Sequence, residues 1–210
     1  MQKIYHLEIC KRALADQFST KALDVIIKAN IGQDKIRYQF KHPQFHFDSN
    51  AFEASFNYIE EQRQIILEIN NSFDKLQASW QAFGRLTHAV QDFYAHSNYI
   101  QLWLNTFQFQ EKPTPQQVVA MDMDILRDPQ LHSGNVYFLD WLAFIPGFYA
   151  IAHYLTPTDS HTHMNLDHPG RGPLFPYALA AAEKRTQYEF ERLRAQMPDE
   201  MQARFCDDRQ

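Results

Sequence analysis

Residues 84–100 read GRLTHAVQDFYAHSNYI, and the pattern in and around this stretch predicts a long α-helix from about residue 77 to residue 104. Three polar residues in it, His88, Asp92 and His96, follow one another at intervals of four. Each step of four residues turns an α-helix by only ~40° beyond a full turn and rises ~6 Å. The three side chains therefore form a row on one face of the helix.

The row has the chemistry of a metal site. His88 and Asp92 can bind one ion, His96 can reach a second ion one turn further on, and the two carboxylate oxygens can bridge them. Zinc suits this mixture of imidazole and carboxylate, with roughly four ligands for each ion. Burying polar groups without partners on an otherwise apolar helix costs several kcal/mol. A bound metal would offset this cost. The alternative is a structural ion pair between a histidine and an aspartate one turn apart.

The rest of the chain favours helices as well. Glycine is scarce, with 6 residues, and no segment shows the sustained apolar–polar alternation of a β-strand. A chain of 210 residues suits one domain with a buried core, so we expect a single all-α domain, a helical bundle over residues 1–210. The other expected helices cover about residues 6–15, 20–31, 50–74, 115–127 and 175–196, with two shorter ones in 136–155 and a polar loop at 156–173.

Further ligand candidates lie near helix ends and in the predicted loops. Ser19 or Thr20 is the expected N-cap of the second helix. Gly32 ends this helix and places Asp34 just beyond it. Ser49 is the expected N-cap of the third helix, and we expect Asp48 to help cap that helix rather than to orient His46. The candidates outside the row are His6, Asp34, His46, His161, His163 and Asp167. Since one structural metal needs only roughly four ligands, a set of this size predicts two or three ions.

Composition narrows the classes of function. Hydrophobic residues make up 45% of the chain, which excludes a disordered protein, and the formal net charge of −5 gives no electrostatic reason to approach nucleic acid or an anionic membrane. Bound cations would reverse the charge locally, so a nucleic-acid substrate is disfavoured but not excluded. The apolar stretch 136–155 contains Asp140, Pro146 and Gly147, which favours a buried helical hairpin, broken at Pro146–Gly147, over a transmembrane segment.

The sequence leaves localisation and redox state open. The start, MQKIYHLEIC, lacks the basic segment and apolar stretch of a secretory signal, which predicts a cytoplasmic protein, or a secreted or periplasmic one if a leader has been removed. Cys10 and Cys206 lie near opposite ends and form no CxxC pattern, so they are either free thiols or one long-range disulfide. No pattern indicates an oligomeric state.

These residues resemble a known superfamily: the zinc-dependent phospholipases C, the fungal single-strand nucleases and the heterokaryon-incompatibility C (Het-C) proteins. Residues 84–100 look like the signature helix of the Het-C proteins. FHFDS at 45–49 is similar to the segment that supplies a zinc histidine in the phospholipases, and ANIGQD at 29–34 to the stretch that supplies an aspartate. YHLEICKRAL at 5–14 resembles the first helix of the family, and HTHMNLDHP at 161–169 resembles its late ligand loop.

The resemblance implies a helical bundle with three zinc sites at the bottom of a cleft. The first site would use Asp34, His46, His88 and Asp92. The second would use His6 and the shared Asp92, with the amino terminus as an additional ligand. The third would use His96, Asp167 and His161, which matches the late loop of the family better than His163 does.

The chemistry implied by the resemblance is the hydrolysis of a phosphate ester by a zinc-bound hydroxide. Asp34, or another carboxylate of the site, would accept the proton of the attacking water. A phospholipid head group is the preferred substrate, since an aromatic stripe could contact acyl chains, although core packing explains the same stripe. Its members are Tyr137, Phe138, Trp141, Phe144, Phe148 and Tyr149. The alternatives are a nuclease of the same superfamily and a non-catalytic, metal-stabilised recognition protein of the Het-C kind.

Overall fold

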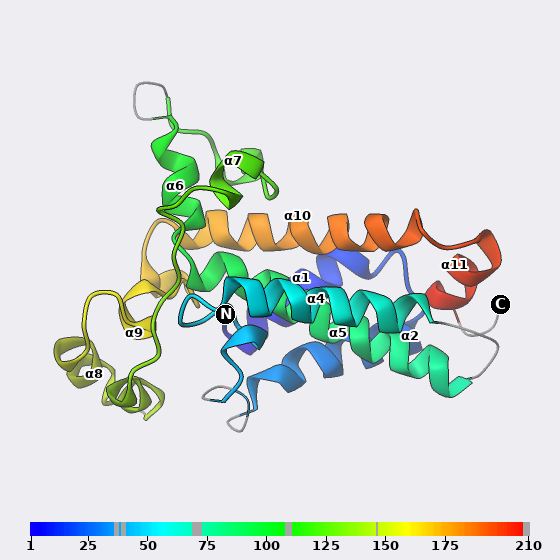
Figure 1. Cartoon of the computed structure of the whole chain (residues 1–210), viewed down its shortest axis with the longest axis horizontal. Coiled ribbons are helices and arrows are strands. Elements are labelled where there is room, and N and C mark those ends of the chain that lie inside the picture. Colours follow the sequence, from blue (N-terminus) through cyan, green and yellow to red (C-terminus); the bar gives the residue numbers. More distant parts are fainter. Residues whose placement is uncertain (36–37, 39–40, 69–72, 108–110, 146, 208–210) are drawn as a thin grey trace.

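The computed structural model describes residues 1–210 apart from 36–37, 39–40, 69–72, 108–110, 146 and 208–210 (Figure 1). The described residues form the predicted all-α fold, in which the only β-type pairings are two isolated bridges. The long helices are α1 (Lys3–Leu14), α2 (Thr20–Ile31), α4 (Phe52–Leu67), α5 (Phe73–His96) and α10 (Phe175–Arg194). The shorter α-helices are α6 (Tyr99–Asn105), α7 (Met123–Leu126), α8 (Tyr149–Leu155), α9 (His161–Met164) and α11 (Asp199–Cys206). Single 3-10 segments are η1 (Gly32–Asp34), η2 (Pro43–Phe45), η3 (Pro115–Gln117), η4 (Phe138–Phe144) and η5 (Pro169–Arg171).

Helix α5 lies at the centre of the bundle. It packs against α2, α4 and α10, while α1 packs against α10 and α2 (Figure 1). Trp80, Phe83, Leu86 and Tyr94 of α5 are fully buried. Burying an apolar side chain of this size stabilises a fold by roughly 1.5–3 kcal/mol. The core therefore fixes the position of the helix that carries the histidine row.

The end of α2 delivers Asp34 to this helix. α2 begins as predicted, since the Ser19 hydroxyl accepts a hydrogen bond from the N–H of Ala22 (3.3 Å). The helix also ends at the predicted place, and Gly32 then begins the tighter turn η1, whose last residue is Asp34. The turn contacts α5, so Asp34 lies beside the histidine row.

The helix predicted for residues 77–104 is interrupted just after the row. The N–H of Asn98 donates to the carbonyl oxygen of His132 (3.0 Å) instead of continuing the helix, and Ser97 forms an isolated bridge with Ser133. Helix α6 starts immediately afterwards. The row therefore occupies the last turns of α5, where a distant loop crosses its end.

The helix predicted for residues 115–127 is wrong. This segment holds only the turn η3 and α7, a helix of 4 residues. Lys184 of α10 donates to the carbonyl oxygen of Val118 (2.8 Å), and the Tyr99 hydroxyl donates to that of Val119 (2.7 Å). These carbonyl oxygens are bound by side chains from other helices, so tertiary contacts override the local preference for a helix.

Ser49 is not the N-cap of α4. Ala51 holds that position, because Ser49 and Asn50 have left-handed backbone conformations (φ 54° and 56°) that turn the chain before the helix begins. The Ser49 hydroxyl instead accepts a hydrogen bond from the N–H of Val136 (3.1 Å). α4 also ends before the predicted residue 74, with residues 69–72 lying outside the described part of the chain.

The apolar segment 136–155 forms two short helices, η4 and α8, as predicted. Gly147 between them has a φ of 86°, while Pro146 is not among the described residues. The prediction that this segment is buried is wrong, because Phe138 and Tyr154 are 85% and 86% exposed. Among the described helices, none is both long enough and apolar enough to span a bilayer.

A buried carboxylate ties this segment to α9. Asp140 of η4 is buried, and its side chain accepts hydrogen bonds from the N–H groups of Tyr137 (2.7 Å) and Thr162 (2.8 Å). The polar residue is therefore the anchor of the segment, and much of its apolar surface faces outward.

The remaining predictions concern the first and last long helices and the state of the two cysteines. Helices α1 and α10 lie close to the predicted 6–15 and 175–196, and α11 was not predicted. Cys10 and Cys206 are both free thiols, which excludes the disulfide alternative.

Candidate metal centre

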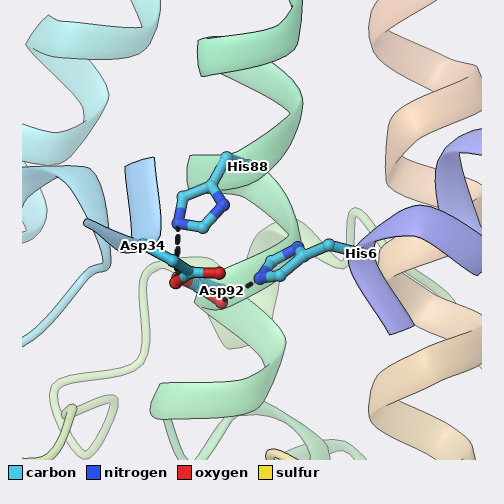
Figure 2. Close-up of side chains that lie close together, drawn as sticks. All are labelled: His6, Asp34, His88 and Asp92. Atoms are coloured by element: carbon cyan, nitrogen blue, oxygen red, sulfur yellow. Dashed lines mark ion pairs between the residues drawn. The ribbon is translucent and has the colours of Figure 1, made fainter. Parts of the chain in front are cut away.

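The carboxylate of Asp92 lies at the centre of the candidate site. It is fully buried on α5, one helical turn after His88. Its Oδ2 is 3.0 Å from Nε2 of His88 and 2.9 Å from Nδ1 of His46, and these two nitrogens are 3.1 Å apart. Asp34 approaches from η1, with its Oδ1 3.8 Å from His88 Nε2 (Figure 2). Side chains from three parts of the chain thus converge around one carboxylate oxygen.

The other oxygen of Asp92 faces a second group. Oδ1 is 3.2 Å from Nε2 of His6, which reaches in from α1 (Figure 2). The same oxygen is 2.5 Å from the amino group of Met1. Nε2 of His96 is 3.9 Å from the same oxygen and 3.1 Å from Oδ1 of Asp167. The Met1 amino group is 2.9 Å from that Asp167 oxygen. Two imidazoles, a second carboxylate and an amine therefore surround Oδ1.

A third group is centred on Asp48, which the sequence pattern predicts as a cap of α4. Its Oδ1 is 2.9 Å from Nδ1 of His161 and 3.2 Å from Nδ1 of His96. Nδ1 of His96 is also 2.9 Å from the carbonyl oxygen of His46, which can only accept, so this nitrogen carries a proton in either charge state of the ring. Nε2 is therefore the ring nitrogen of His96 that can offer a lone pair to a metal. Asp48 contacts Nδ1 of both His96 and His161 and can orient these two rings.

The structure brings most of the sequence candidates together. Asp34, His46, His88 and Asp92 gather as the resemblance implies. In the implied third set, His96 Nε2 is 3.1 Å from Oδ1 of Asp167, and the ring centroids of His96 and His161 are 4.5 Å apart. Asp167 also lies beside the amino terminus, and His161 lies beside Asp48. His163 joins neither group, since its Nε2 donates to the carbonyl oxygen of His153 (2.8 Å).

The charges in the cluster counteract the effect of burial. Burial alone would raise the pKa of Asp92, but the Met1 ammonium and the imidazoles of His88, His96 and His6 hold that pKa well below its usual range. Burial lowers the pKa of His88 to about 4, so its ring is neutral at neutral pH. Burial also disfavours the charged Met1 amine, yet neighbouring carboxylates raise its pKa to about 11. Around Oδ2, an ionised carboxylate beside a neutral imidazole is the protonation state that metal binding requires. Burial and the Met1 ammonium lower the pKa of His96, but Asp92, Asp48 and Asp167 raise it well above its usual range, so an ion at its Nε2 would have to displace a proton.

The nitrogen and oxygen donors around Asp92 could hold a divalent cation. Nε2 of His6 is buried, faces Asp92 and has no hydrogen-bond partner among the described residues, an arrangement that costs about 1–3 kcal/mol when nothing satisfies the atom. Around a tetrahedral zinc with bonds of about 2.0–2.1 Å, ligand atoms lie about 3.3 Å apart. The separations of 2.9, 3.0 and 3.1 Å among Asp92 Oδ2, His46 Nδ1 and His88 Nε2 are close to that spacing.

The cluster opens onto a cleft of about 620 Å³, a volume typical of small-molecule sites. Trp141 and Val136 of the apolar segment line one part of it, and Lys3 and Ile4 line another. The cluster itself contributes Met1, Asp34, His46, Asp48, His96, His161 and Asp167. A ligand in the cleft can therefore reach these residues beside an apolar surface, whereas His6, His88 and Asp92 are fully buried and do not line the cleft.

A family model, that of the VWA7 N-terminal domain, matches residues 1–120 of the chain. The matched part contains α5 and every residue around Asp92 Oδ2, whereas Asp167 and His161 lie beyond it. No curated protein and no solved structure gives a significant match.

Proposed function

The chain belongs to the VWA7 N-terminal domain family, and we propose that its buried cluster is a zinc centre that hydrolyses phosphate esters. One observation carries the proposal: the two oxygens of Asp92 have different nearest partners, His88 and His46 at Oδ2 and His6 and the Met1 amine at Oδ1. A structural ion pair needs one partner for a carboxylate, and this arrangement supplies enough donors for two ions. A carboxylate in this position would bridge them.

The residues divide into two ligand sets. One ion would be held by Asp34, His46, His88 and Oδ2 of Asp92. The other would be held by His6, His96, Asp167 and Oδ1 of Asp92, beside the Met1 amine. When bound, the ions would supply positive charge to the phosphate and leaving oxygens and would lower the pKa of water in the cleft.

Asp34 is the proposed proton acceptor. Its side chain is 11% exposed and lines the cleft, whereas that of Asp92 is fully buried. A carboxylate at the cleft wall can take the proton of an attacking water. Lys3, which also lines the cleft, adds a fixed positive charge for a phosphate group.

A phospholipid head group is the preferred phosphodiester. Trp141 lines the cleft and is 50% exposed, and the segment around it presents further exposed apolar side chains. Those side chains are Tyr137, Phe138, Leu139, Ile145, Phe148 and Tyr149; that of Phe144 is not among the described ones. Acyl chains attached to a head group in the cleft would contact such a surface favourably. Exposed aromatic rings also stack on unpaired bases, so a single-strand nuclease is the second candidate.

Metal analysis and two parallel substrate assays test the proposal. The purified protein, supplied with zinc and dialysed, is incubated with phosphatidylcholine vesicles and, separately, with single-stranded DNA. We expect bound zinc and release of phosphocholine, both lost in Asp92→Asn and both retained in Asp74→Asn, an exposed position on the same helix.

Each other result has a distinct meaning. Release of nucleotides alone would select the nuclease. Bound zinc without turnover of either substrate would select the non-catalytic, metal-stabilised protein. Absence of zinc from the folded protein would reject the metal centre altogether.

A further inference from the structure

Gln91 lies next to Asp92 in the sequence but makes its hydrogen bonds inside the helical core. It is fully buried between α5, α1, α2 and α10. Its Oε1 is 2.6 Å from Nδ1 of His6 and 3.1 Å from Nδ2 of Asn30. Its Nε2 is 3.0 Å from the hydroxyl oxygen of Thr186. Every polar atom of this amide therefore has a partner away from the cleft.

The hydrogen-bond network fixes which end of the Gln91 amide is the acceptor. The Thr186 hydroxyl donates its own proton to the carbonyl oxygen of Ala182 (2.9 Å), so it must accept from the group beside it. That group can only be the amide nitrogen of Gln91. The opposite end, which faces His6, is consequently the oxygen.

Asn30 confirms this orientation from the other side. The Thr87 hydroxyl donates to the carbonyl oxygen of Gly84 (2.9 Å), so it accepts from Asn30, whose Nδ2 lies 3.0 Å away. The same Nδ2 donates to Oε1 of Gln91. Two independent chains of donors and acceptors thus place a hydrogen-bond acceptor against Nδ1 of His6.

We infer that Gln91 is a positioning residue that holds His6 in the Nδ1–H tautomer and so keeps the Nε2 lone pair available to a divalent cation. A neutral imidazole has one N–H, and the Gln91 oxygen at 2.6 Å takes it. Without that acceptor, the carboxylate oxygen of Asp92, 3.2 Å from Nε2, would attract the proton to the metal-facing nitrogen (Figure 2). The amide therefore competes with the carboxylate for the single imidazole proton.

This inference rests on the proposed zinc centre for its purpose, but the tautomer can be measured without any metal. Protein labelled with 15N-histidine is freed of metal and studied at pH 8 by long-range proton–nitrogen correlation NMR. His6→Asn identifies the signals of His6. We expect the neutral Nδ1–H tautomer; an Nε2–H tautomer or an imidazolium in the wild-type protein would overturn the inference.

A pair of substitutions tests the role of Gln91 itself. Gln91→Met removes the acceptor while keeping the length of the side chain, and we expect His6 to change to the Nε2–H tautomer. Zinc affinity, measured by competition with a chromophoric chelator, should fall by about 10- to 100-fold, as is usual when the partner of a metal-binding histidine is removed. Gln91→Glu keeps an acceptor and should retain the wild-type tautomer. Gln81→Met, at an exposed position of α5, is the matched control.

The outcomes separate this inference from the proposed function. A tautomer change in Gln91→Met with unaltered zinc affinity would overturn the positioning role. A wild-type protein that shows the expected tautomer but binds no zinc would refute the proposed function and the metal part of this inference, while leaving the hydrogen-bond assignment of Gln91 intact.

Discussion

The carbonyl oxygen of Ile26 in α2 occupies the space that a side chain on Gly84 of α5 would need. A β-carbon at position 84 would lie 2.2 Å from that oxygen and 2.7 Å from the β-carbon of Ala29. The two helices therefore approach each other at a point where only hydrogen fits. This contact sets the distance between the helix that delivers Asp34 and the helix that carries the histidine row.

Gly84→Ala should destabilise the fold by about 2 kcal/mol, because overpacking against a backbone atom exceeds the ~1 kcal/mol gained in helix propensity. The free energy of unfolding from urea titration measures the effect. Gly32→Ala is the control, since no atom lies within 4 Å of the β-carbon it would add. Equal stability of the two variants would contradict the close contact.

Asp92→Ala should remove more zinc than any other single substitution in the cluster, because it takes one ligand from each of the two sets. His88→Ala, which removes a ligand from one set only, should retain part of the metal. The metal content after dialysis, with Asp74→Ala as the control, gives the comparison. Full zinc content in Asp92→Ala would show that the bridging assignment is wrong.

Glu189→Gln should destabilise the protein by about 3–5 kcal/mol, because it leaves two buried guanidinium groups without a full counter-charge. Glu189 is fully buried and accepts hydrogen bonds from Arg63 (2.8–3.0 Å) and from Arg185 (2.7 Å). Glu60→Gln removes a half-exposed partner of Arg63 and should change stability by less than ~1 kcal/mol. Thermal unfolding of both variants measures the effect. Similar midpoints for Glu189→Gln and Glu60→Gln would contradict the larger loss of stability expected for Glu189→Gln.

The metal-free protein should lose stability in acid, in part through Asp48. Burial raises the pKa of this carboxyl, but His161 and His96 have the larger effect and hold the pKa well below its usual range. For a group whose folded pKa is lowered, the stabilisation is present above the unfolded pKa of roughly 4 and disappears as the pH falls, by at most ~1.4 kcal/mol per pH unit.

Urea midpoints between pH 2.5 and pH 6 test this prediction. Asp48→Asn should give a flatter acid dependence than the wild-type protein, whereas Asp16→Asn, at an exposed position, should follow the wild type. An unchanged acid dependence in Asp48→Asn would show that the two imidazoles do not hold this carboxyl in its ionised form.

The two thiols should react at very different rates. Burial raises the pKa of Cys10 to about 11, so at pH 8 its reactive thiolate is scarce as well as inaccessible. Cys206 is only partly buried and should react first with a thiol-specific reagent. A thiol titration should count two reactive thiols in denaturant and only one that reacts rapidly under native conditions.

The features that the sequence predicts correctly depend on neighbours within a few residues. The row of His88, Asp92 and His96 is readable because four-residue spacing fixes their common face, and Ser19 is readable as a cap because its partner is Ala22. Each inference needs only the geometry of one helix.

The features that the sequence does not predict depend on distant partners. Asp48 looks like a cap, and its actual partner His161 is 113 residues away. The helix expected near residue 118 is replaced because Lys184, 66 residues later, binds the Val118 carbonyl oxygen. The only local signal for Asp48 is its position two residues after His46, and that spacing does not specify which imidazole the carboxylate meets.

The position of the row within a single continuous helix makes the site more sensitive to insertions than to substitutions. One extra residue between His88 and Asp92 would rotate everything that follows by ~100° about the helix axis and move it ~1.5 Å along. Asp92 and His96 would then point away from His88, although every ligand would still be present in the chain. Relatives in which this stretch has changed length can keep the helix and its core, but they cannot keep this geometry.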